Sequence, residues 1–286
     1  MIKFLVAVLF FFSGLAQAAD PIVITHAAGK TSVAETEMMN LSKKLDEQKV
    51  NVKFTSTGQC EDAIKLWNST TTGPTIMWYS TSTDRLEATK GKPCTANLAK
   101  ARFVMVRKSQ VWLCSGATSK PFTTPDLRVG TQTVMPGEDL VADINKSNNY
   151  SWKPIPIKAT GDGLIALANG DLDYYFITRP GIGDRVAKGE IKCVGSSNRD
   201  DTVPYLGTLF KANGDLYSAL TVMPVVITKN LTDDQFQKVQ DYFDPKKNDE
   251  YRKHLEFDDI KLEKIDSNMT EVFLNHAKKS RTFYKK

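Results

Sequence analysis

The sequence predicts an α/β protein of two domains. Short runs rich in β-branched and aromatic residues alternate with segments that have an apolar residue every three or four positions, which is typical of a parallel sheet with covering helices. This alternation occurs twice along the chain. The length of 286 residues is sufficient for one large or two modest domains.

The first unit precedes the middle of the chain. The pair Ser32 and Glu35 has the spacing of a capping box, which predicts a helix beginning at Ser32. Expected strands in this unit lie at residues 22–25, 50–54 and 75–79, and a second helix lies near 62–67.

The second unit begins near Val111. Expected strands lie at residues 111–114, 127–130, 155–157, 174–177 and 191–194, with helices that begin near Pro136, Gly161 and Ile182. A strand is expected at 217–223, then a connection at 224–228 leading to a helix that begins with the capping pair Thr232 and Gln235. Helices at 248–255 and 269–284 complete the chain. We therefore expect residues 109–203 to form a domain inserted into a discontinuous first domain of residues 19–108 and 204–286.

Residues 1–18 have the features of a cleaved secretory signal. A basic start at Lys3 precedes an apolar run over residues 4–12, and Ala16-Gln17-Ala18 has the small-x-small pattern of a signal-peptidase site. The alternative is an uncleaved anchor, although the run is shorter than an ordinary span of about 20 residues. We expect a mature protein that is soluble outside the cytoplasm.

Four cysteines in an oxidising compartment predict two disulfides. Four cysteines permit three pairings, and none of the spacings is Cys-x-x-Cys, so neither a zinc knuckle nor thioredoxin chemistry is indicated. We favour Cys60–Cys94 and Cys114–Cys193, because each pair then lies within one expected domain.

The charge balance and the motifs exclude several function classes. Lys and Arg number 38 against 33 Asp and Glu, a mild and dispersed excess that does not indicate nucleic-acid binding. There is no Gly-x-Ser-x-Gly, His-Glu-x-x-His or Walker motif. The three histidines, His26, His254 and His276, indicate no metal site. A secreted hydrolase remains open, because triad members need not be neighbours in sequence.

Gly181 and Gly183 follow an expected strand, as the first glycines of a dinucleotide fingerprint do. The third position holds Val186, whose bulk obstructs close packing of helix on strand. The sequence therefore indicates a plain turn and no cofactor.

Small-residue loops between strands and helices are the most informative feature. Such loops occur at residues 27–32, 80–83, 131–137 and 159–163. Helix N-termini carry unpaired N–H groups that suit an anion, and ligands of open α/β sheets lie beyond the carboxyl ends of the strands. Each loop alone is compatible with a plain connection, but four from two domains indicate a binding cleft.

Three segments resemble the substrate-binding proteins of tripartite tricarboxylate transporters, the TctC or Bug-type branch of periplasmic binding proteins. The first is ITHAAG, which ends at Gly29 and is similar to the family's PFAAGG-type loop. The second is IPIKATGDGLIALANGDLDYYF over residues 155–176, and the third is VAKGEIKCVGSSNRDDTVPYLGTL over residues 186–209.

The resemblance implies a two-lobed, type II periplasmic-binding-protein fold in which two α/β domains, joined by crossover strands, close on a small carboxylate. The ligand-binding residues it implies are Ala27, Ala28, Gly29, Lys30, Thr31, Ser32, Ser80, Thr81, Thr133, Gly137, Thr160, Gly161, Asp162 and Asp173. Trp78 lines the cleft or belongs to the core.

Departures from the family pattern bear on the ligand. Lys30 replaces a glycine and adds a charged contact for an anion, whereas Asp162 and Glu138 favour an amino or cationic group. We expect a non-enzymatic, monomeric receptor that delivers a small organic acid to a membrane permease. The alternatives are a secreted hydrolase and a sensor or interaction protein on the same scaffold.

Overall fold

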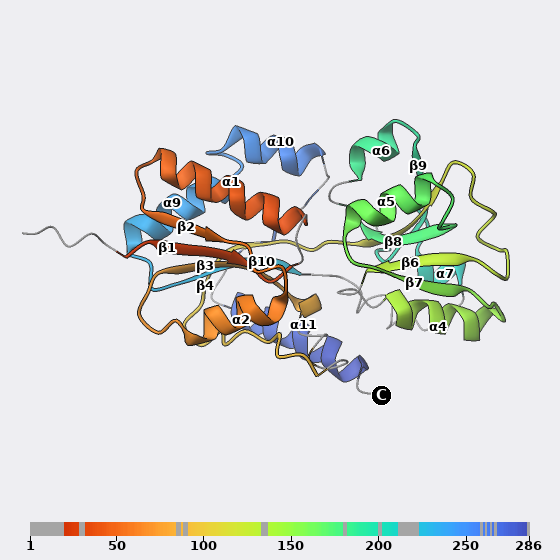
Figure 1. The fold of residues 1–286 in the computed structure, drawn as a ribbon, viewed down its shortest axis with the longest axis horizontal. Coiled ribbons are helices and arrows are strands. Elements are labelled where there is room, and N and C mark those ends of the chain that lie inside the picture. The colour runs from red at the N-terminus through yellow and green to blue at the C-terminus, as the bar shows by residue number, and fades with distance from the viewer. Residues whose placement is uncertain are drawn as a thin grey trace, which may run out of the picture.

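The computed structural model contains two five-stranded sheets, each covered by helices on both faces (Figure 1). It describes residues 20–28, 32–83, 87, 91–132, 137–179, 182–199, 202–210, 223–257, 260, 262–263, 265 and 268–284. The expected signal segment, residues 1–18, and residues 217–222 of an expected strand lie outside this description. No helix within the described residues is long and apolar enough to cross a membrane.

The first sheet belongs to a lobe made from both ends of the chain. Its strands, in spatial order, are β2 (Val52–Thr55), β1 (Ile22–His26), β3 (Thr75–Ser80), β10 (Pro224–Lys229) and β4 (Arg102–Val106). One face is covered by α1 (Val33–Glu47), α9 (Asp233–Phe243) and α10 (Asp249–Phe257), and the other by α2 (Cys60–Ser69) and α11 (Met269–Tyr284) (Figure 1). We call this unit the first lobe.

The second lobe repeats this plan. Its strands, in spatial order, are β7 (Lys153–Ile157), β6 (Arg128–Gln132), β8 (Tyr174–Thr178), β5 (Val111–Gly116) and β9 (Ile191–Ser196). The helices α5 (Thr160–Ala168) and α6 (Gly183–Ala187) cover one face, and α4 (Gly137–Asn148) and α7 (Leu206–Leu209) cover the other (Figure 1). In the spatial order of each sheet, the first three strands are parallel. The fourth strand is antiparallel to them, and the fifth is antiparallel to the fourth.

Local sequence explains the helix starts. Ser32 accepts a hydrogen bond from the Glu35 amide at 3.2 Å, and Thr232 and Gln235 form a complete capping box. The apolar faces expected for the helices that follow these caps are buried. In α1, for example, Met38 and Leu41 have no exposed surface. Most expected strands and helices are therefore present within a few residues of their predicted bounds.

Two expectations about the chain after residue 203 were wrong. Residues 224–228, expected to be a connection, belong to β10, in which Pro224 occupies the first position, where a missing N–H is tolerated. The second lobe also extends past residue 203, because Leu206 and Phe210 pack into its core. The strand β4 was not expected at all.

Both expected disulfides are present. Cys60 is bonded to Cys94 and Cys114 to Cys193, so each bridge lies within one lobe. Cys114 and Cys193 are paired across the neighbouring strands β5 and β9. The pairing favoured from the sequence is confirmed.

A buried ion pair lies where the chain leaves the first lobe. Arg107 follows β4 and is 2% exposed, and its guanidinium donates to both carboxylate oxygens of Glu37 in α1, at 2.6 and 3.1 Å. The Arg107 amide also donates to the Pro224 carbonyl at 3.0 Å. These contacts fix the start of the crossover against both α1 and β10.

We predict that Glu37→Gln lowers the free energy of unfolding by about 3–5 kcal/mol, because it removes the carboxylate charge that faces a buried guanidinium. Urea unfolding measures this loss. The control is Lys44→Gln, which breaks a half-exposed pair with Glu47 and should cost about 0.5 kcal/mol or less. Equal effects of the two substitutions would show that the buried pair does not hold the crossover.

Candidate functional site

The carboxyl ends of the parallel strands in the two sheets face each other. β4 runs parallel to β1 and β3, since both β3 and β4 are antiparallel to β10, and it ends at Val106 beside the ends of those strands. After residues 107–110 the chain enters β5 at Val111, which pairs with Thr178 at the carboxyl end of β8. We call these two facing rims the carboxyl edges. Helices α1, α2, α4 and α5 each begin at one of them.

The first expected loop follows β1. Ala27 is buried and its amide donates to the Trp78 carbonyl at 3.0 Å, while Ala28 is partly buried. Ser32 caps α1 with its hydroxyl. The expected residues Gly29, Lys30 and Thr31 lie outside the described part of the chain.

A polar cluster beside this loop was not expected from the sequence. His26 ends β1 with no exposed surface, and its Nε2 lies 3.3 Å from the Ser56 hydroxyl and 3.9 Å from Oε1 of Glu35. Ser56 donates a 2.5 Å hydrogen bond to the same Glu35 oxygen. Burial lowers the pKa of His26, and the nearby Glu35 charge opposes that shift.

This cluster does not have the order of a catalytic triad. In a triad the carboxylate holds Nδ1 of the histidine, and the serine donates to Nε2. Here the Ser56 proton goes to Glu35, and the carboxylate approaches the same ring nitrogen as the serine. The arrangement instead joins the end of β1, the loop after β2 and the first turn of α1.

The second expected loop follows β3. The Ser80 hydroxyl lies 2.8 Å from that of Ser82, and the Thr81 hydroxyl accepts from the Met223 amide at 3.1 Å. Both Ser80 and Thr81 are buried. Trp78 is 8% exposed and packs in the core under α1, and its Nε1 has no hydrogen-bond partner within the described residues.

In the second lobe the residues at the start of α5 lie at the carboxyl edge. Thr160 is partly buried, and Gly161 and Asp162 are exposed. A Cβ added at Gly161 would meet no atom within 4 Å. The surface at Gly161 is therefore open to a ligand.

Gln132 and Tyr175 form a hydrogen-bonded group with Thr160 at the start of α5. Nε2 of Gln132, at the end of β6, donates to the Thr160 hydroxyl at 2.8 Å and to the Tyr175 hydroxyl at 2.9 Å. Burial raises the pKa of Tyr175 to about 12. Neither residue was expected in the site, because their partners are distant in sequence. Gln132 lies within the expected small-residue loop 131–137, and that position was the available signal.

Two further residues expected in the site, Gly137 and Asp173, make contacts that support the fold of the second lobe. Gly137, at the start of α4, is buried against Thr131, where an added Cβ would lie 2.7 Å from the Thr131 side chain. Asp173 precedes β8, at the opposite end of the sheet from the carboxyl edge, and accepts from the Arg128 amide at 2.8 Å. The structure thus brings Thr160, Gly161 and Asp162 together and leaves Asp173 apart from them. Thr133 lies outside the described residues.

Known structures share this architecture over nearly the whole chain. The periplasmic binding protein BugD superposes with a TM-score of 0.69 at 8% identity, covering 93% of this chain and 95% of BugD. The chain has the periplasmic-binding-protein fold. MatC from Rhodopseudomonas palustris, solved with bound malate, gives a TM-score of 0.66 at 12% identity, covering 93% of this chain and 97% of MatC.

A third protein of this fold is R. palustris Rpa4515, solved with adipate. It gives a TM-score of 0.65 at 11% identity, covering 94% of this chain and 96% of the other. No protein-family model matches the sequence, and no curated protein is significantly similar to it. The likeness is therefore one of fold, at identities too low to transfer a ligand residue by residue.

Two glycines of α5 provide a matched pair of substitutions. We predict that Gly163→Ala destabilises the protein by about 1–3 kcal/mol, because the added Cβ would lie 2.3 Å from the Tyr175 ring. Gly161→Ala should be neutral or stabilising, since its Cβ enters open space and alanine favours the helix. Thermal unfolding compares the two, and a Gly163→Ala protein as stable as wild type would contradict the packing described.

The raised pKa of Tyr175 predicts a loss of stability in alkali. The phenol stays neutral in the folded protein up to about pH 12, whereas in the unfolded chain it ionises near its ordinary value of 10. Stability is therefore fully present below pH 10 and falls as the pH rises from 10 towards 12. Denaturant titrations over this range should show a smaller loss for Tyr175→Phe than for wild type, and identical slopes would contradict the prediction.

Proposed function

We propose that the protein is a periplasmic receptor that binds a small organic acid between its two lobes and delivers it to a membrane permease. The observation that carries the proposal is the pair of facing carboxyl edges, each with helices that begin at it. Amide groups at helix N-termini bind anions without a cationic side chain. Two lobes joined by a short crossover at residues 107–110 allow closure around a ligand by a hinge motion.

The ligands of similar folds support an acid. MatC is a malate complex and Rpa4515 an adipate complex, and both are carboxylates of a few carbons. Exposed Asp162 at the start of α5 is the feature that disfavours an anion at this point. We therefore assign one carboxylate of the ligand to the first-lobe loop, from Ala27 to Ser32, and the neighbouring uncharged part of the ligand to Thr160 and Gly161.

No catalytic function is proposed. The one serine, histidine and carboxylate cluster described, formed by Ser56, His26 and Glu35, has a hydrogen-bond order unsuited to activating a nucleophile. A receptor returns its ligand unchanged, so a hydrolase would be revealed by product formation from the corresponding esters or amides.

Thermal unfolding of the mature chain with malate, adipate and methylphosphonate tests the proposal, with malamide and adipamide as uncharged controls. An acid that binds only the folded state stabilises it by about 2.7 kcal/mol at one hundred times its dissociation constant. We expect at least one acid to raise the midpoint and the amides to have no effect. A shift with amides alone would discard the anion site, and no shift with any compound would count against a receptor for small acids.

Gly161→Leu provides the matched variant. Its Cβ would meet no atom within 4 Å and the position is exposed, so folding should be preserved while the second-lobe half of the site is blocked. We expect calorimetry to show at least a tenfold loss of affinity for the acid that stabilises wild type, with an unchanged unfolding midpoint in the absence of ligand. Undiminished binding would place the ligand elsewhere.

A further inference from the structure

The connection from β3 to β4 has no regular secondary structure over residues 91–98. Residues 81–83 come directly after β3 and belong to the carboxyl edge of the first lobe. Further along the same connection, residues 91–98 run beside α2. A segment without a helix or strand ladder must satisfy its backbone groups in other ways, so its conformation depends on the contacts of its side chains and backbone. The contacts that hold it therefore determine how well the edge is ordered.

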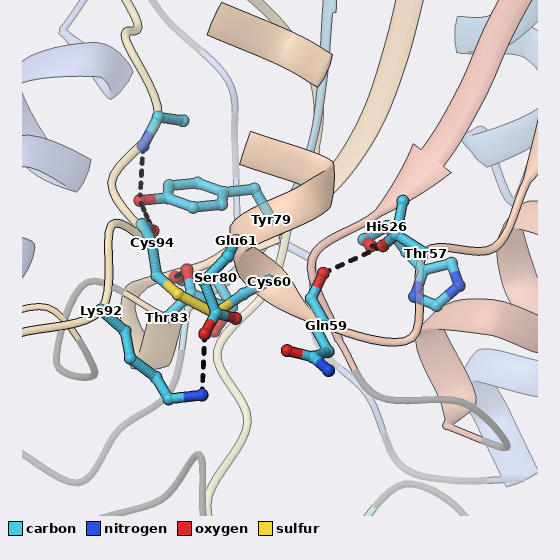
Figure 2. Close-up of a disulfide and its surroundings, with 11 residues drawn as sticks. His26, Thr57, Gln59, Cys60, Glu61, Tyr79, Ser80, Thr83, Lys92 and Cys94 are labelled. Carbon is cyan, nitrogen blue, oxygen red and sulfur yellow. Dashed lines mark hydrogen bonds and ion pairs between the residues drawn. A yellow bond between two sulfur atoms is a disulfide. The ribbon is translucent and has the colours of Figure 1, made fainter. Parts of the chain in front are cut away.

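The strongest of these contacts is covalent. Cys60 is the first residue of α2, at the carboxyl edge, and its bond to Cys94 joins the connection to that helix (Figure 2). Cys60 is 6% exposed and Cys94 is fully buried. An ion pair of Lys92 with Glu61, at 2.7 Å, reinforces the same junction.

Tyr79 adds a second connection at the same place. Its hydroxyl donates to the Cys94 carbonyl at 3.3 Å and accepts from the Ala96 amide at 3.1 Å (Figure 2). Tyr79 is the residue before Ser80, whose carbonyl accepts a 2.6 Å hydrogen bond from Thr83. The phenol therefore links the irregular segment to the strand that carries the second binding loop.

The loop after β3 is also linked to neighbouring parts of the first-lobe carboxyl edge. Thr81 accepts from the Met223 amide beside β10, and Ser56, in the loop before α2, donates to Glu35 of α1. Together with the Cys60–Cys94 bridge, these contacts join the first turn of α1 to the loop after β2, the start of α2 to the segment 91–98, and Thr81 to the residue before β10. A rim held in this way pays little ordering entropy when a ligand binds.

We propose that Cys60, Cys94 and Tyr79 are positioning residues for ligand binding: they hold the loops of the first-lobe carboxyl edge in their binding geometry and so set the affinity, in addition to stabilising the fold. This inference rests on the proposed receptor function. The residues need not touch the ligand, and their effect passes through Ser80, Thr81 and the start of α2.

The second disulfide is a matched control within the same molecule. Cys114 and Cys193 pair in the interior of β5 and β9, whereas the carboxyl edge of that sheet lies at Val111 and Ser196. β5 and β9 are paired on both sides of the bridge, with a register shift between Leu113 and Cys114. Its removal should therefore lower stability without changing the geometry of the edge.

The experiment compares Cys60→Ala/Cys94→Ala with Cys114→Ala/Cys193→Ala. Affinity for malate and adipate is measured by calorimetry well below the unfolding midpoint of each protein, which is determined in parallel. We expect a loss of at least tenfold in affinity for the first variant and less than about twofold for the second, although both unfold at lower temperature than wild type. Equal affinities in the two variants would overturn the proposal.

Tyr79→Phe keeps the proposal testable if the first double variant does not fold. It removes only the hydroxyl, and we expect a several-fold loss of affinity. Trp67→Phe is its control, because Trp67 donates to the Asn97 carbonyl of the same segment from the α2 end away from the edge. Equal affinities in Tyr79→Phe and wild type would overturn the role of Tyr79. If wild type itself binds none of malate, adipate and methylphosphonate, the receptor function fails first, a result distinct from tight binding by every variant.

Discussion

The brevity of the crossover between β4 and β5 is the constraint on which the site depends. A chain extends at most about 3.5 Å per residue, so residues 107–110 cannot let the two sheets separate far at this point. Because β4 ends and β5 begins at carboxyl edges, the same four residues force those edges to face each other. The buried pair of Arg107 with Glu37 then fixes the crossover to α1.

The two edges differ in how they are organised. In the first lobe, polar side chains bond mainly to one another and to the backbone, as Ser56 does with Glu35 and Thr81 with Met223. In the second lobe, an uncharged corner formed by Gln132, Thr160 and Tyr175 supports an open glycine. Both edges combine small side chains with a carboxylate, which is Glu35 in the first lobe and exposed Asp162 in the second.

The sequence predicted the architecture well, because its signals were local. The capping residues Ser32 and Thr232 mark helix starts, and the domain assignment was sufficient to pair the cysteines. It failed where tertiary context decides: residues 224–228 were expected to lead into the helix at Thr232, but they form a central strand, in which Pro224 takes the first position. The cluster of His26, Glu35 and Ser56 joins residues up to 30 positions apart, and no spacing rule predicts such a contact. Asp173 illustrates the reverse case, since a family likeness suggested a ligand contact and the structure gives it a backbone amide at the far end of its strand.

The strand order has a consequence for the order in which the lobes can be completed. All five strands of the second sheet lie between residues 111 and 196, so that sheet is contiguous in the chain. The first sheet places β10 between β3 and β4, and its hydrogen-bond ladder stays interrupted until residues 224–229 are in place. A chain that becomes free to fold from its N-terminal side onward can therefore finish its second sheet while its first sheet still lacks a central strand. The last strand to arrive thus completes the sheet that contains β1, the first strand of the chain.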